Sequence, residues 1–178
     1  MAKSFKMKYF GVRVLDDNDK DMSFESEISL SGKIRRVYIM VKNINQNKLK
    51  SCLKILDKYM KLHEIGKNEI IEKYMEKENM LLFIKDHFDH LDREEELKIF
   101  GTNDFQNVNI KEFVETIEPP DITIINNNNG RIITSLGYTF INGSKKTINI
   151  ELNEKLKVND VKYNYGGYSN MEYGGHVA

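Results

Sequence analysis

The chain has 178 residues, of which 40% are hydrophobic and 30% charged, and this fits a single domain with a buried core and a polar surface. Its 27 basic side chains balance 27 acidic ones, so the charge surplus typical of nucleic-acid-binding proteins is absent from the total. Cys52 is the only cysteine, which excludes an internal disulfide and a cysteine-based zinc site. The N-terminus lacks the apolar run of a signal peptide, and no stretch of about 18 apolar residues indicates a membrane span. We therefore expect a soluble, cytoplasmic protein that does not act at a membrane.

The first forty residues have the alternating apolar pattern of β-strands. The pattern predicts three strands, over 9–15, over 22–30 and around 37–41. Ser31-Gly32 favours a tight turn, so the second and third strands should pair as an antiparallel hairpin. On the third strand, Tyr38 and Met40 should share one face, opposite to the face of the alternating valine and isoleucine side chains.

The middle of the chain changes to helical periodicity. It predicts four helices, over 47–63, 70–75, 81–91 and 110–117. Gly66 is expected to end the first helical segment, and Asn109 to cap the last helix. Residues 94–100 either continue the third helix or restart it. Cys52 has leucine neighbours at helical spacing, which predicts a buried thiol rather than a catalytic one.

After Pro119-Pro120, which should end the last helix, the chain returns to strands at 122–125, 131–141 and 148–152, with a further edge strand near 158–165. Asn142-Gly143 favours a hairpin turn. The order of strands, helices and strands predicts an α+β fold. We expect an antiparallel sheet of about six strands, three N-terminal and three C-terminal, with a central block of about four helices on one face. This single domain should span 1–165, and the glycine- and tyrosine-rich residues 166–178 should form a flexible tail.

One segment holds a cluster of chemically versatile side chains. Asp86 and His90 are four residues apart, so on a helix they lie one turn above each other, with His87 beside them. These three residues predict a metal site, and with it a metal-binding protein or metal-dependent hydrolase, as the alternative function. A metal site needs three or four converging ligands, however, and the order of residues here does not match HEXXH. A solvated acidic helix face is the other interpretation.

No common catalytic or nucleotide-binding motif occurs in the chain. GXSXG, GXGXXG and GXXXXGK[ST] are all absent from the sequence, so we predict no catalytic residue and no cofactor. Nucleic-acid binding would need a basic surface made by five side chains from the N-terminal strands, namely Lys6, Lys8, Arg13, Arg35 and Arg36. We do not expect a nucleic acid as partner, because each of these basic runs is short.

Three segments carry a resemblance to known proteins. They are Ser31-Gly32-Lys33-Ile34, Leu82–Phe88 and Leu136-Gly137-Tyr138-Thr139-Phe140. The sequence resembles, over most of 20–165, small uncharacterised bacterial α+β domains, some of which look similar to immunity-type proteins encoded beside bacterial toxins. This resemblance implies a non-enzymatic protein that binds another protein, and it supplies no catalytic residue. We expect the partner to bind the sheet face left uncovered by helices, through Tyr38, Met40 and Tyr138.

Overall fold

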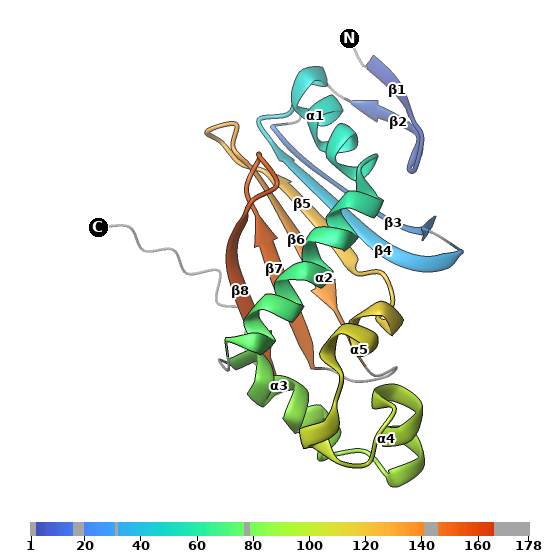
Figure 1. Cartoon of the computed structure of the whole chain (residues 1–178). Helices are drawn as coiled ribbons and strands as arrows, with labels where there is room; N and C mark the ends of the chain where they lie inside the picture. The colour runs from blue at the N-terminus through green and yellow to red at the C-terminus, as the bar shows by residue number, and fades with distance from the viewer. Residues whose placement is uncertain (1–2, 16–19, 31, 77–78, 141–145, 166–178) are drawn as a thin grey trace.

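The computed structural model describes residues 3–15, 20–30, 32–76, 79–140 and 146–165. Six strands form the main sheet (Figure 1): β3 (Asp21–Leu30), β4 (Lys33–Lys42), β5 (Asp121–Asn126), β6 (Ile132–Tyr138), β7 (Thr147–Leu152) and β8 (Val158–Asn164). Two short strands, β1 (Lys3–Met7) and β2 (Gly11–Leu15), pair with each other in a separate sheet. The described residues also form five α-helices: α1 (Gln46–Leu56), α2 (Tyr59–Met75), α3 (Asn79–Phe88), α4 (Arg93–Phe100) and α5 (Ile110–Thr116).

The strands of the main sheet follow one another in chain order from β3 to β8. All neighbouring pairs are antiparallel except β4 and β5, which are parallel. Parallel neighbours need a long crossover connection, and the helical block between these two strands supplies it. The α+β class and the six-stranded sheet are therefore confirmed. The expected division into three N-terminal and three C-terminal strands is not, because β2 pairs with β1 and leaves two strands before the helices and four after them.

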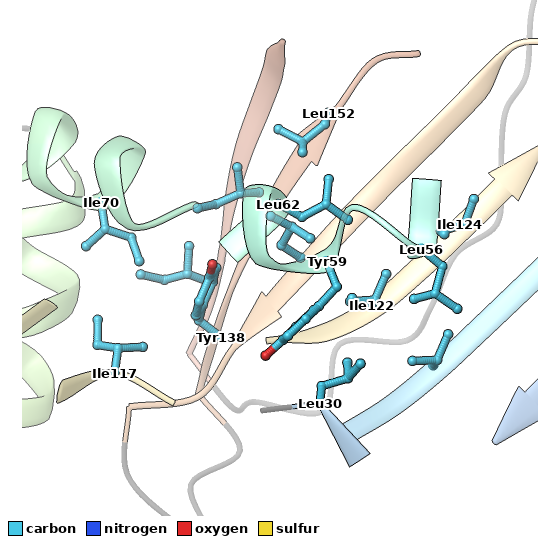
Figure 2. Close-up of a cluster of buried hydrophobic side chains, with 14 of the residues drawn as sticks. Leu30, Leu56, Tyr59, Leu62, Ile70, Ile117, Ile122, Ile124, Tyr138 and Leu152 are labelled. Atoms are coloured by element: carbon cyan, nitrogen blue, oxygen red, sulfur yellow. The ribbon is translucent and has the colours of Figure 1, made fainter. Parts of the chain in front are cut away.

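Helices α1, α2 and α3 lie on one side of the sheet, where α1 contacts β4 and β5, α2 contacts β6 and α3 contacts β8. Helix α4 lies beyond the end of the sheet and contacts α5 (Figure 1). Figure 2 shows Leu62 and Ile70 of α2 gathered with Ile122 of β5 and Leu152 of β7 in the buried layer between them. Leu62 and Ile70 are each 0% exposed. Burying a side chain of this size contributes about 1.5–3 kcal/mol, so this layer is the main source of stability.

The boundaries of the first two helices differ from the prediction. The predicted helix over 47–63 is divided at Asp57-Lys58, and α2 then runs through Gly66 without a break. Gly66 is buried against Tyr138 of β6, and a Cβ atom at this position would lie 2.8 Å from the ring atoms Cε2 and Cζ. Glycine is needed here because helix and sheet approach closely, and it does not mark a helix end. The predicted turn at Asn142-Gly143 and the predicted tail lie outside the described residues.

Candidate protein-binding face

Alternation along the strands gives the sheet a second face without helices. The fully buried side chains of β4, β5 and β6 point toward the helices, so the side chains between them point to the opposite side. We call the outward side chains of β3 to β8 the uncovered face. Tyr38 and Met40 lie on it and are partly exposed.

An apolar row crosses the uncovered face. Met40 of β4 is paired with Ile125 of β5, and Ile125 is paired with Ile133 of β6. Paired side chains on one sheet face are close neighbours, so these three residues form a continuous apolar strip. Ile133 is 40% exposed, which is high for an isoleucine in a strand. Tyr38 lies in the next row, opposite Thr123.

The rim of the uncovered face is polar and mainly acidic. By strand alternation it carries six carboxylates against three basic side chains: Asp21, Glu25, Glu27, Asp121, Glu151 and Asp160 against Arg36, Lys42 and Lys162. Lys42 pairs with Asp21 at 2.9 Å, and Lys162 pairs with Glu151 at 2.6 Å. An apolar centre with a polar rim is the general plan of protein interfaces.

Tyr138 does not belong to this face, and its predicted position is wrong. It is 1% exposed and lies on the covered side of β6, beneath α2 (Figure 2). Its hydroxyl donates to the carbonyl oxygen of His63 at 3.2 Å and lies 3.2 Å from the Nδ1 of the same residue. Burial raises the pKa of Tyr138 and lowers the pKa of His63, so both groups are uncharged at neutral pH.

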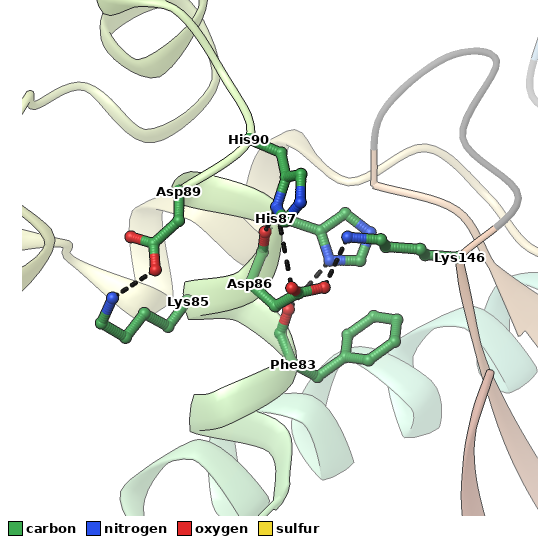
Figure 3. A network of polar contacts seen from close by, with 7 residues as sticks. All are labelled: Phe83, Lys85, Asp86, His87, Asp89, His90 and Lys146. Carbon is green, nitrogen blue, oxygen red and sulfur yellow. Dashed lines mark hydrogen bonds and ion pairs between the residues drawn. The ribbon is translucent and has the colours of Figure 1, made fainter. Parts of the chain in front are cut away.

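The histidine and aspartate side chains at the end of α3 and just after it each have a local partner (Figure 3). Asp86 forms an ion pair with Lys146 at 2.5 Å, and this bond lowers the pKa of Asp86. The exposed His90 has its Nδ1 2.6 Å from the carbonyl oxygen of Asp86 and 3.6 Å from the carboxylate Oδ1. Asp89 points away and pairs with Lys85. The cluster is thus a set of local ion pairs and helix-end contacts.

His87 differs from these neighbours because it is buried. It is 1% exposed, and its Nδ1 donates to the carbonyl oxygen of Phe83 at 2.9 Å. Its ring packs 4.5 Å from the ring of Phe83 and 5.6 Å from that of Phe140, measured between centroids. Burial lowers the pKa of His87. Among the described residues no group of three or more histidine, cysteine, aspartate or glutamate side chains is arranged to hold a metal ion.

Among the described residues, the basic side chains considered for nucleic-acid binding do not lie together on one surface. Lys8 pairs with Asp57 at 3.2 Å. Arg35 pairs with Glu118 on the covered side of β4, whereas Arg36 lies on the uncovered face. The side chain of Arg13 lies outside the described part of the structure.

Comparisons with known proteins add no relative. No protein-family model matches the sequence, and neither the curated proteins nor the solved structures give a match. Within the described segments, no helix combines the length and the apolar character that crossing a membrane requires. The reasoning on function therefore depends on the surfaces of this chain alone.

Proposed function

We propose that this chain is a non-enzymatic cytoplasmic protein of a bacterium, and that it binds another protein through its uncovered face. The observation that carries the proposal is the apolar row of Met40, Ile125 and Ile133, which is partly exposed on a sheet whose other face is packed against helices. Large contiguous apolar patches on soluble proteins mark sites where a partner binds, and we interpret this row as part of such a site. Tyr38 beside the row adds an aromatic side chain of the type that often anchors interfaces.

The resemblance to immunity-type domains suggests which partner to test first. If the chain acts as such a protein, the partner is the product of an adjacent toxin-like gene. The absence of catalytic motifs supports binding over catalysis, and the scattered contacts of Asp86, His87 and His90 do not favour the metal-dependent alternative.

Affinity purification from the native host tests the proposal, with Ile133→Lys as the disruptive variant. A lysine in the row would place an unpaired charge in the interface, so we expect partner recovery to fall and the Kd to rise by roughly 30-fold or more. Leu82→Lys is the matched control, because Leu82 is a 58% exposed residue on α3, away from the uncovered face.

Both variants should keep the wild-type melting temperature, because both positions are exposed. The proposal is wrong if the wild-type chain recovers no stoichiometric protein partner. It is also wrong if Ile133→Lys and Leu82→Lys retain the partner equally well.

A further inference from the structure

A groove lies at the edge of the sheet, apart from the apolar row. It runs beside β8 and has a volume of about 490 Å³. Glu69 and Lys73 of α2 and Asn79 of α3 line one side of the groove, and β8 itself lines the other. This arrangement of a helix facing an edge strand is one that proteins use to hold extended peptides.

Strand β8 has one free edge within the described structure. It pairs with β7 on one side, and no described strand pairs with it on the other. The N–H of Val161 donates to the side-chain Oδ1 of the neighbouring Asp160 at 2.9 Å. This amide therefore has a side chain of its own strand as acceptor. A backbone carbonyl of an added strand could replace that side chain as the acceptor.

The groove also contains a carboxylate without a described partner. Glu69 is half-buried and makes no hydrogen bond or ion pair with any residue that the structure describes. Burial raises the pKa of Glu69 and the neighbouring Glu72 raises it further, while Lys73, one turn along α2, acts in the opposite direction. The basic residue of the groove, Lys73, pairs with Glu76 at 2.9 Å. Lys73 therefore acts on Glu69 only at longer range, and a ligand with a positive charge would give Glu69 the direct ion pair that no described residue makes with it.

We propose that this groove binds an extended, positively charged peptide segment, which adds to the edge of β8 as a further strand and places a lysine or arginine beside Glu69. Backbone hydrogen bonds to β8 would provide affinity for any extended chain, and the Glu69 carboxylate would select a basic one. At about 3.3 Å per residue, a segment of roughly six to eight residues matches the length of β8. The groove shares Asp160 with the rim of the uncovered face, but the apolar row of that face lies on β4, β5 and β6, so the inference does not depend on the function proposed above.

Fluorescence anisotropy with a dye-labelled peptide of four lysine–valine repeats tests this inference on the full chain. The matched probes are a glutamate–valine peptide of equal length and a lysine–valine peptide whose alternate amides are N-methylated. We expect the lysine–valine peptide to bind roughly tenfold more tightly than either, because one probe has the wrong charge and the other has lost backbone donors.

Glu69→Gln tests the role of the carboxylate. It should weaken binding of the lysine–valine peptide roughly fivefold or more, since it removes the charge and keeps the shape. Glu94→Gln, at an exposed position on α4 outside the groove lining, should stay within about twofold of the wild type. Ile133→Lys should leave this binding unchanged, which separates the groove from the uncovered face.

Amide chemical-shift changes locate the bound peptide. They should occur in β8 and not in β3, the other edge strand of the sheet. The inference is wrong if the lysine–valine peptide does not bind, or if the three peptides bind equally well. It is also wrong if Glu69→Gln binds like the wild type, or if the shift changes are confined to β3.

Discussion

Gly66→Ala tests the close contact between α2 and the sheet. In most helices this change is stabilising, because alanine has a better helix propensity than glycine by about 1 kcal/mol. Here the added methyl group would collide with the Tyr138 hydroxyl and lie 2.8 Å from two ring carbons. The ring is 1% exposed, so it has little freedom to move aside.

The two effects oppose each other, and we expect the collision to dominate. Overpacking a well-filled core costs about 1–3 kcal/mol, and sometimes more. Contacts with two ring atoms and the hydroxyl oxygen of a buried tyrosine place this position at the upper end, which leaves a net loss of about 2 kcal/mol in the free energy of unfolding. For a chain of this size the melting temperature should fall by about 4–8 °C.

Urea unfolding followed by circular dichroism measures the effect. Asn68→Ala is the control, because Asn68 is exposed on the same helix, and it should be neutral or slightly stabilising. Combining Gly66→Ala with Tyr138→Phe removes the hydroxyl collision, so the double-mutant cycle should show a coupling energy of about 1 kcal/mol. A Gly66→Ala variant as stable as the wild type, or more stable, would refute the reasoning.

Three further predictions concern single side chains. Burial lowers the pKa of His63 and His87 in the folded state, whereas both titrate near 6.5 when unfolded. The unfolded chain therefore takes up protons first as the pH falls below 6.5, and the free energy of unfolding should decrease between pH 7 and pH 5 with a slope of up to about 1.4 kcal/mol per pH unit for each histidine. Urea titrations should show this, and a His87→Gln variant with the same slope as the wild type would contradict it. Cys52 is 0% exposed and burial raises its pKa to about 11, so a thiol reagent should modify it only after unfolding; rapid labelling of the native chain would show this to be wrong. Asp92 caps α4 in a capping box with Glu95, so Asp92→Ala should cost about 1 kcal/mol in urea unfolding, and no measurable loss would argue against the cap.

Most of the fold could be predicted because alternation and helical periodicity are strong in this chain. The break at Asp57-Lys58 could not, since neither residue interrupts a helix by itself. Asp57 ends α1 and also accepts hydrogen bonds from Lys8 and Tyr9, far away in the sequence. Gly66 led to a wrong helix boundary, because glycine is common both at the ends of helices and at positions where backbones pack closely.

The candidate face shows a similar limit. Tyr138 was assigned to the wrong side of the sheet, although it shares its alternation with Leu136, which is completely buried. That alternation was the signal that could have placed it correctly. Ile125 and Ile133 were missed because each lies next to another isoleucine in the sequence, and periodicity cannot tell which of two adjacent apolar residues faces outward. Only the pairing of the strands shows that they continue the row from Met40.

The parallel pairing of β4 with β5 has a consequence for how the chain is made. During synthesis the hairpin of β3 and β4 emerges long before β5. Ile39 and Val41 can therefore pair with β5 only after all five helices have been synthesised. Contacts between such distant segments slow folding. Until the last third of the polypeptide has been synthesised, the edge of β4 that later pairs with β5 therefore stays unpaired, and the apolar side chains beside it stay uncovered.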